Sequence, residues 1–553
     1  MKPFFITTAI DYTNGAPHIG HAYEKVLADV VARFQRQTGR EVFLLTGVDQ
    51  HGQKVQQSAE KAGISPQEYV GGVTAKFRAL WEKLGVRYDG WAATTDVLHK
   101  ECVRANLQLL WDDKVPGTDR SRWIYRKTQR GFYSVRQEQF LTDKERGPDG
   151  EFGPEWQPVE EREEENFYFR LTAHPDLGFD PKQWLLDFID RRGKEGKPFV
   201  VPEFRVAELR NAVEKLEGDL CISRPAARLQ WGIPFPESFG EGFVTYVWFD
   251  ALVNYITFAP GHDPHHGGHS ATATPSGLGF SDYWPPVHVI GKDILIPAHG
   301  VYWPVMLKAL GFTDEEMPTL LVHGWWNIRG KGGESEKMSK SLGNVVDPDV
   351  LADKYGSAAL RYYLMSDIAT GRDADFSEER LVQRYNVDLA NGLGNLVNRT
   401  LNMSRKYREG RIGVTGNPPA DLEAHLLENS KSLNTYCEAF GNSQVQAALE
   451  CLGDVVNRTN ALVDSSAPWK LSKDPEQAGR LDAVLATLIL SARTAATMLL
   501  PVLPEAAEEI LRQLNLPLGE SVEAHSLSLP EGYCCGEPKP VFPRIELPAP
   551  EVA

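Results

Sequence analysis

An α/β fold is predicted for this chain of 553 residues, and three observations carry the prediction. Two short apolar runs rich in aromatic and β-branched residues, 4–10 and 42–45, have the composition of buried strands. Between them an apolar side chain recurs every four residues from Ala22 to Phe34, which is typical of a helix. Strand, helix and strand in this order favour a βαβ unit with a parallel, Rossmann-like sheet. After about residue 385 the pattern is helical almost to the end, so an α-helical bundle is expected to follow.

The segment from about 115 to 200 interrupts the α/β pattern. It contains a Lys/Arg-rich stretch at 122–136, a Gly/Pro-rich loop at 147–158 and an acidic run at 160–165. We therefore interpret it as an insertion between two halves of the sheet domain.

Strand signals resume at 243–248 and 287–291. The low-complexity stretch between them, 261–280, carries four histidines. We interpret it as a solvated surface loop rather than a metal site, because no rigid element would hold the ligands. The Pro-rich last 25 residues are expected to be irregular.

The composition excludes several classes of protein. With 42% hydrophobic and 24% charged residues, the chain is not disordered, collagenous or a coiled coil. Six cysteines without a C-x-x-C pair make neither a disulfide framework nor a cysteine zinc knuckle. The net charge of −16 argues against a nucleic-acid binder that uses its whole surface, although a local basic patch remains compatible with it.

Targeting and membrane signals are not expected in this sequence. Asp11 interrupts the N-terminal apolar run before it reaches signal-peptide length. The most apolar late stretch, 481–500, contains two charged residues and stops at a proline, so we interpret it as a buried bundle helix. The prediction is a soluble, cytoplasmic protein with no membrane partner.

The first candidate motif is Pro17-His18-Ile19-Gly20-His21, where the first strand passes into a helix. A helix N-terminus offers unpaired N–H groups and positive potential to an anion, and glycine allows a ligand to approach the backbone. The two imidazoles can donate hydrogen bonds to phosphate oxygens. Taken alone, the pattern is equally typical of capping or core histidines.

The second candidate motif is Glu336-Lys337-Met338-Ser339-Lys340-Ser341, in a Gly-rich surround from 330 to 343. Lysine is a compact cation on a flexible stem, so a loop can bring it onto a triphosphate. An exposed basic loop is the alternative for this motif alone.

Together the two motifs, some 300 residues apart on an α/β scaffold, resemble the signatures of the class I aminoacyl-tRNA synthetases. The resemblance implies ATP-dependent activation of an amino acid, with Mg²⁺ accompanying ATP, and transfer to the 3′ end of a tRNA. It places His18 and His21 on the phosphates and Gly20 beneath the adenine. Lys337 and Lys340 would close over the leaving pyrophosphate, and Asp293 belongs to the implied ATP-binding set.

Further segments resemble the methionyl-tRNA synthetase family over nearly the whole chain. They are 9–15, 46–54, 246–251 and 291–295. An insertion of about 85 residues cannot hold the editing domain of the leucine, isoleucine and valine enzymes. The resemblance implies a methionine pocket made of Ala9, Ile10, Tyr12, Trp248, Ala251, Tyr255 and His299, with Asp49 on the α-ammonium group. Aromatic edges suit a polarizable thioether, although each aromatic taken singly is more typical of core packing.

The helical C-terminal part is similar to that family's anticodon-binding helices. The resemblance implies that Asn395, Arg399 and Trp469 read the CAU anticodon of tRNA(Met), since Trp stacks on unpaired bases and Asn and Arg bond to base edges. A local basic patch follows closely along the chain: Arg405, Lys406, Arg408 and Arg411. A solvated helix face is the alternative for the patch alone.

Three features depart from the family pattern. The places of the family's zinc ligands hold Ser134, Gln137, Gly153 and Trp156, so a knuckle without structural zinc is predicted. The stretch around His299 is one residue longer than in the family. The approach to the lysine motif, 329–336, is also lengthened.

The domains predicted on this basis are two halves of a catalytic domain, an insertion, a lysine-loop region, an anticodon-binding domain and a tail. Their boundaries are 1–114, 115–200 (insertion), 201–325, 326–385 (lysine loop and stem contact), 386–530 (helical, anticodon-binding) and 531–553 (Pro-rich tail). No further RNA-binding or dimerising module is recognised after about residue 530, so a monomer is expected.

Two alternative functions are an adenylating ligase without a tRNA substrate and a non-catalytic RNA-binding protein. Neither is favoured, because the first would lack the C-terminal helices and the second would have damaged His or Lys motifs.

Overall fold

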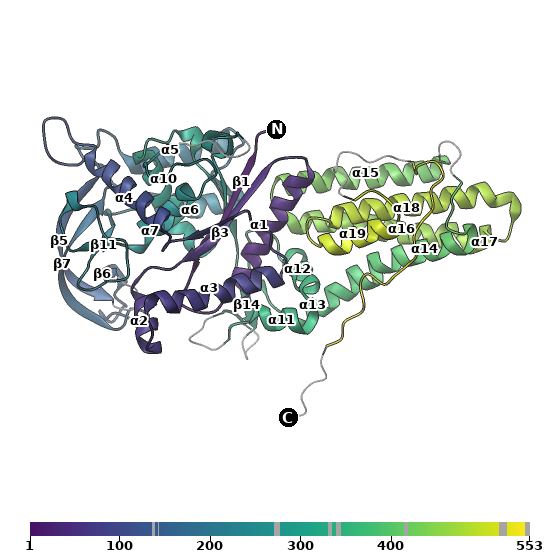
Figure 1. Cartoon of the computed structure of the whole chain (residues 1–553), viewed down its shortest axis with the longest axis horizontal. Helices are drawn as coiled ribbons and strands as arrows, with labels where there is room; N and C mark the ends of the chain where they lie inside the picture. The colour runs from purple at the N-terminus through teal and green to yellow at the C-terminus, as the bar shows by residue number, and fades with distance from the viewer. Residues whose placement is uncertain are drawn as a thin grey trace, which may run out of the picture.

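The main sheet of the computed structural model lies in one lobe, and the helical bundle extends from it as a second lobe (Figure 1). The structure describes residues 1–134, 139–141, 143–269, 277–329, 334–338, 344–413, 418–518 and 528–547. The sheet has the strand order β2-β3-β1-β12-β13-β8 with β4 paired to β3, and every pairing in it is parallel. Its strands are β1 (Phe4–Thr8), β2 (Asp11–Tyr12), β3 (Val42–Asp49), β4 (Gly90–Ala93), β8 (Val200–Val201), β12 (Val287–Gly291) and β13 (Thr319–His323). The predicted Rossmann-like α/β fold is confirmed.

Helices cover both faces of this sheet because its strands carry apolar residues on alternate sides. Ile6 of β1 belongs to one buried cluster and its neighbour Phe5 to the other. The first cluster contains side chains of α1 (Ile19–Gln37), α3 (Pro66–Lys83) and α12 (Ser357–Ser366). The second contains side chains of α4 (Val97–Asp112), α5 (Pro181–Lys194), α6 (Val206–Glu214), α7 (Val247–Thr257) and α10 (Trp303–Ala309). Further helices of this lobe are α2 (Gln53–Ala62), α8 (Phe280–Tyr283), α9 (Lys292–Ile294) and α11 (Pro348–Tyr355).

The insertion forms a separate antiparallel sheet at the outer edge of the catalytic lobe (Figure 1). Its strands are β5 (Ile124–Ser134), β6 (Gln139–Leu141), β7 (Val159–Phe169) and β9 (Leu220–Cys221). β8 belongs to the main sheet, but β9, which follows it in the chain beyond residue 200, belongs to the insertion sheet. Strands of the two sheets therefore alternate along the chain. At the predicted zinc-free knuckle the Ser134 hydroxyl donates to the carbonyl of Trp156, while Gln137 lies outside the described residues.

The run 243–248 is only partly a strand, and the prediction of a main-sheet strand there is wrong. β11 (Phe243–Thr245) pairs antiparallel with β10 (Ser223–Pro225) in a two-stranded sheet of its own. Val247 already begins α7, most of whose buried residues are apolar. A short run of aromatic and aliphatic residues fits a buried helix start as well as a buried strand, which explains the error.

The predicted C-terminal helical bundle is confirmed. It comprises α13 (Glu378–Arg384), α14 (Asn395–Arg408), α15 (Ala420–Gly441), α16 (Val445–Ser466), α17 (Pro468–Leu471), α18 (Ala478–Leu499) and α19 (Pro504–Gln513), with a π-helical segment, η7 (Tyr385–Gly394), between α13 and α14. Among the described residues, only the helical stretch 475–499 has the length and composition to cross a membrane, and 78% of its apolar window is buried inside the protein. That burial is typical of a core helix.

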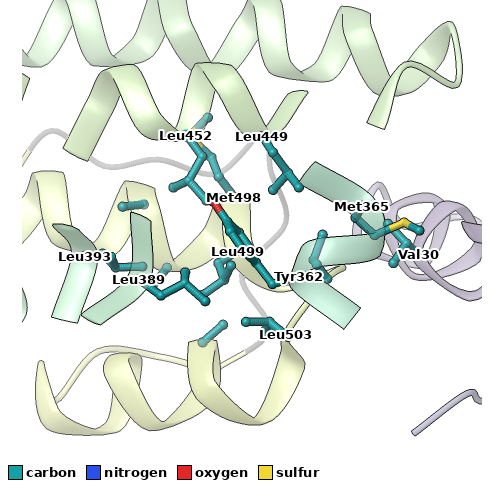
Figure 2. Close-up of a cluster of buried hydrophobic side chains, with 14 of the residues drawn as sticks. Val30, Tyr362, Met365, Leu389, Leu393, Leu449, Leu452, Met498, Leu499 and Leu503 are labelled. Carbon is teal, nitrogen blue, oxygen red and sulfur yellow. The ribbon is translucent and has the colours of Figure 1, made fainter. Parts of the chain in front are cut away.

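The bundle and the sheet domain share one continuous apolar core. Figure 2 shows Met365 of α12 beside Val30 of α1, with the bundle side chains Leu449, Leu452, Met498 and Leu499 on its other side. α1 therefore packs against the sheet and against the bundle at once.

The segment after residue 528 contains no helix or strand in its described part, as expected, yet it is packed. It runs back along α14 toward α13 (Figure 1). Cys535 N donates to the carbonyl of Gly410 at 2.9 Å, and the Asn386 side chain exchanges two hydrogen bonds with the backbone of Ile545. Phe542 is 6% exposed, so this segment covers the junction between η7 and α14.

Candidate active site

A cavity of about 680 Å³ opens at the carboxyl ends of β1, β3, β12 and β13. This is the edge where parallel α/β sheets bind ligands. The cavity brings together all eight residues of the predicted methionine set: Ala9, Ile10, Tyr12, Asp49, Trp248, Ala251, Tyr255 and His299. It also brings in His18, Gly20, His21, Asp293 and Lys337 of the predicted nucleotide set. Lys340 lies outside the described residues.

His18 and His21 cap the N-terminus of α1 with both imidazole Nδ1 atoms. His18 Nδ1 accepts from Gly20 N–H, and His21 Nδ1 accepts from the backbone N–H of His18, both at 3.1 Å. Since an acceptor nitrogen carries no proton, the proton of each neutral ring is on Nε2. The capping geometry therefore fixes one tautomer and leaves Nε2–H as the donor of each ring.

The His18 imidazole leaves little space for a side chain at position 20, where the chain has Gly20. A Cβ at this position would lie 2.9 Å from Cε1 of His18, closer than a carbon contact allows. Any side chain here would displace the His18 ring from its cap.

A buried charge cluster lies behind the histidines. Lys25 Nζ, on a side chain that is 1% exposed, donates to Asp11 Oδ1 at 2.6 Å and to Glu24 Oε1 at 2.8 Å. Burial raises the pKa of Asp11 to about 7, with Lys25 opposing the rise and Glu24 adding to it. Glu24 Oε2 is 3.1 Å from Nε2 of His323. Three members of this cluster (Asp11, Glu24 and His323) line the cavity, so it presents fixed polar groups there.

The apolar end of the cavity contains a hydrogen-bonded pair of defined direction. His299 Nδ1 donates to the carbonyl of Ile294 at 3.0 Å, so its Nε2 accepts from the Tyr255 hydroxyl at 2.8 Å. Burial lowers the pKa of His299 to about 4 and raises that of Tyr255 well above its usual value, so both are neutral near pH 7.

His299 lies in η4 (Leu295–Tyr302), which is kinked rather than continuously helical, because Ile296 has extended backbone angles (φ −116°, ψ 127°). His299 follows the kink and lines the cavity.

Asp49 ends β3 with a carboxylate that is 6% exposed. Thr94 Oγ1 donates to it at 3.3 Å, and burial together with the charge of Asp250 raises the Asp49 pKa well above the usual value. Behind it, Asp250 is fully buried and is bonded to His51 at 2.6 Å and to His99 at 2.8 Å. Sequence reasoning did not select Asp250, His51 or His99 as site residues. They are separated by up to 199 positions, and no spacing rule joins them.

The first lysine of the second motif contacts an aromatic ring. Lys337 ends β15 (Ser335–Lys337), which pairs antiparallel with β14 (Trp326–Arg329). Lys337 Nζ is 3.6 Å from the ring centroid of Trp325, and Lys292 Nζ is 3.8 Å from it. The indole Nε1–H of Trp325 donates to Asp293 at 3.3 Å. Cation–π contacts of this kind hold Lys337 at the cavity.

The predicted anticodon residues lie in the bundle, outside the cavity. Asn395 is exposed and Arg399 half-buried on α14, and Trp469 on α17 is 38% exposed. Arg399 donates to Asp464 near the end of α16 at 2.8 Å, and α17 follows directly. α17 lies at the end of the bundle remote from the sheet domain (Figure 1).

The predicted basic patch is partly neutralised. Arg405 pairs with Glu537 at 3.3 Å, and Arg408 is ion-paired with Asp482. Arg411 is exposed and its backbone bridges to Cys534. Acidic partners that are remote in sequence therefore reduce the positive field that the local sequence indicates.

Comparisons with known proteins agree with this geometry. Residues 4–149 and 155–401 match the family model described as tRNA synthetases class I (M). The chain is 37% identical over 564 residues to a methionine–tRNA ligase of Lactococcus lactis, covering 99% of this chain and 78% of that protein. It is 38% identical over 556 residues to one of Rhizobium meliloti, covering 99% of both. A solved structure of Mycobacterium tuberculosis methionyl-tRNA synthetase in complex with methionyl-adenylate has a TM-score of 0.85 and 34% identity, covering 98% of this chain and 100% of that one.

The parallel sheet, with the histidine motif after its first strand and the lysine motif opposite, defines a class I aminoacyl-tRNA synthetase. The identity extends over 99% of this chain, and both relatives are methionine–tRNA ligases. The chain belongs to the methionyl-tRNA synthetase family, and it is a methionine–tRNA ligase that forms an adenylate at the expense of ATP.

Proposed function

We propose that the cavity holds L-methionine and ATP together and that the bundle selects tRNA(Met). A carboxylate oxygen of methionine bonds to the α-phosphorus of ATP, the bond to the bridging oxygen breaks, and pyrophosphate leaves. A ribose hydroxyl of the terminal adenosine then attacks the activated carbonyl carbon, loses its proton and releases AMP. The single observation that supports this proposal is the convergence of the eight methionine residues and five nucleotide residues on one cavity.

At the nucleotide end, His18 and His21 direct Nε2–H donors toward the phosphates. Their Nδ1 atoms accept from backbone N–H groups, so the proton of each neutral ring is on Nε2. Such preorganised donors stabilise charge that develops on phosphate oxygens. Lys337, and with it Lys340, adds positive charge where pyrophosphate departs, and Asp293 belongs to the same set.

At the amino-acid end, Asp49 accepts the α-ammonium group in a charge-assisted hydrogen bond. Tyr12, Trp248 and Tyr255 line the cavity with aromatic rings that suit a thioether. The neutral Tyr255–His299 pair supplies a polar contact in the side-chain pocket without a charge. Ala9, Ile10 and Ala251 complete the apolar lining.

Mg²⁺ enters this scheme bound to the phosphates of ATP. Among the residues that the structure describes, no three His, Cys, Asp or Glu side chains converge as a metal cage, so phosphate oxygens and water would provide most of its ligands. Its charge would neutralise the departing pyrophosphate. The insertion is proposed to fold without zinc, since Ser134, Gly153 and Trp156 offer no thiolate or imidazole.

Asn395, Arg399 and Trp469 are proposed to read the CAU anticodon. An exposed indole can stack on an unpaired base, and an amide and a guanidinium can bond to base edges. We further propose that the protein acts as a monomer in the cytoplasm.

The decisive measurement is ATP–pyrophosphate exchange with each of the twenty amino acids, followed by aminoacylation of tRNA(Met). Exchange that depends on methionine, together with methionylation of the tRNA, is the expected result. Exchange without aminoacylation would favour an adenylating ligase, and activity in neither assay would favour a non-catalytic RNA-binding protein. His21→Gln is a suitable negative control, because Gln retains a donor near Nε2 but cannot also accept at the Nδ1 position.

A further inference from the structure

The ammonium end of the cavity is supported from behind by a buried carboxylate that does not itself line the cavity. Asp250 has no exposed surface, and each of its oxygens is bonded to a different imidazole. Nδ1 of His51 donates to Oδ2 at 2.6 Å, and Nε2 of His99 donates to Oδ1 at 2.8 Å. A carboxylate with both oxygens satisfied in this way is held in one orientation.

The three residues join separate elements that build the pocket. His51 follows Asp49 by two residues, after the end of β3. Asp250 lies on α7 between Trp248 and Ala251, which line the cavity. The His51–Asp250 bond therefore ties the segment that carries the ammonium-binding carboxylate to the helix that carries the side-chain pocket.

The rest of that segment is held as well. Gln50 N–H donates to Thr94 Oγ1 at 2.9 Å, and Gly52 N–H donates to the carbonyl of Trp231 at 3.2 Å. The indole of Trp231 returns a hydrogen bond to the carbonyl of Gln50 at 2.5 Å. Among these contacts, only the hydrogen bond between His51 and Asp250 connects the segment to α7.

Asp250 also acts through its charge. Burial would raise the pKa of Asp250, but His51 and His99 outweigh burial and lower it to about 2, so the group is ionised near pH 7. Its charge, together with burial, raises the pKa of Asp49. The other titratable groups around this end are Lys54 on the cavity wall and Cys102 of α4, whose thiol bonds to Thr257.

We propose that Asp250, held between His51 and His99, is a positioning residue for methionine recognition. It fixes Asp49 relative to Trp248 and Ala251, and it places a second negative charge behind the bound ammonium group. This inference rests on the proposed role of Asp49, so the experiment includes variants of both carboxylates.

The experiment measures methionine-dependent ATP–pyrophosphate exchange for Asp250→Asn between pH 5.5 and 8.5, with saturating Mg–ATP. The KM for methionine is expected to rise about tenfold or more, because a charge-assisted contact is lost, while the KM for ATP changes less than about twofold. The acid limb of the pH profile of kcat/KM for methionine is expected to move to lower pH. The reason is that the variant removes the Asp250 charge, which raises the pKa of Asp49. A purely structural role would lower the amount of active enzyme without shifting this limb.

Three variants serve as controls. Asp29→Asn removes an equally buried carboxylate, bonded to Arg361 at 2.7 Å but outside the cavity, and should leave the KM for methionine and the acid limb unchanged. His51→Ala should raise the KM for methionine as Asp250→Asn does. His51→Asn should restore most of it, because an Asn amide can donate from the position of Nδ1.

The outcomes separate this inference from the proposed function. If Asp49→Asn raises the KM for methionine but Asp250→Asn leaves both KM and the acid limb unchanged, the inference is overturned and the role of Asp49 stands. If Asp49→Asn leaves the KM unchanged, the role of Asp49 fails and the inference fails with it. If Asp250→Asn does not fold, the KM for methionine of His51→Ala is compared with that of His51→Asn. A higher KM for His51→Ala supports the inference, and equal KM values overturn it.

Discussion

Phe34 and Phe440 stack face to face, with ring centroids 4.4 Å apart and planes inclined by 10°. Phe34 lies near the end of α1, whose first turn is capped by His18 and His21, and Phe440 lies near the end of α15 in the helical bundle. One aromatic pair therefore connects the helix of the active site with the bundle.

Phe440→Ala should uncouple the two lobes. Removal of a buried Phe side chain destabilises a protein by about 3–5 kcal/mol. In this variant the space left by the Phe440 ring would lie against α1. We expect a larger loss of aminoacylation than of ATP–pyrophosphate exchange, since exchange does not need the bundle. Urea unfolding and both assays measure the effect. Leu422→Ala, about 27 Å away along the same helix, is the control for stability alone, and an equal loss of aminoacylation in both variants would contradict the coupling.

Gly20→Ala should disable the histidine motif without a loss of fold. The new Cβ would lie 2.9 Å from the His18 ring and would force it out of its cap. Loss of one preorganised donor reduces kcat by about 10²–10³, and exchange is expected to fall to that extent. Gly71→Ala in α3 is the matched control, since nothing lies within 4 Å of its added methyl. Similar exchange rates for the two variants would count against the role of the cap.

Trp469→Ala should impair recognition of the tRNA alone. Stacking of a base on an aromatic side chain contributes about 1–3 kcal/mol, so aminoacylation is expected to fall about 10- to 100-fold while exchange is nearly unchanged. Leu427→Ala removes another exposed apolar side chain of the bundle and should affect neither assay. Equal losses in both assays would rule out Trp469 as an anticodon contact.

Homocysteine should be activated at a low rate. It differs from methionine by one methyl group, and an apolar pocket discriminates such a group by only about 1–3 kcal/mol. Exchange with homocysteine is therefore expected about 10- to 200-fold below exchange with methionine. Glutamate, whose charge has no partner in the apolar lining, should give none. Complete absence of exchange with homocysteine would argue against this pocket.

The stability of the bundle should fall as the pH decreases from about 6.5 to about 4. His425 lies between Ser491 and Thr459, and burial together with Arg458 lowers its pKa to about 4. In this range the unfolded chain binds a proton that the folded protein does not, so acidification favours unfolding. Thermal unfolding at pH 7 and pH 5 should show a smaller decrease for His425→Gln than for the parent. The same decrease in thermal stability in both proteins would exclude His425 as the source of the pH dependence.

The sequence indicates those parts of the site whose residues lie close together in the chain. His18, Gly20 and His21 lie at the start of the helix that follows the first strands, so their position at a helix N-terminus could be inferred from the local sequence alone. The methionine pocket draws on three segments, 9–12, 248–255 and 299, and only resemblance to a family brought these together.

Other features depend on contacts between remote segments and carry no local signal. The members of the buried Asp250–His51–His99 arrangement come from three separate segments. His51 and Asp250 lie in stretches that resemble the family, but no local pattern joins them to each other or to His99. The run 243–248 was misassigned because strand and helix starts share its composition. The partners of Arg405 and Arg408 lie more than 70 residues away, so their ion pairs could not be anticipated.

α1 has a mechanical consequence for the enzyme. Its 19 residues form a rod about 28 Å long, with the His18 and His21 imidazoles at one end and the stacked Phe34 near the other. Because a helix transmits a tilt without bending much, a rotation of about two degrees about the bundle end would displace the imidazoles by about 1 Å. A misplacement of that size can cost about 10²-fold in rate. On the role proposed for these imidazoles, the accuracy of phosphate positioning depends on the contact between the lobes, about five helical turns away.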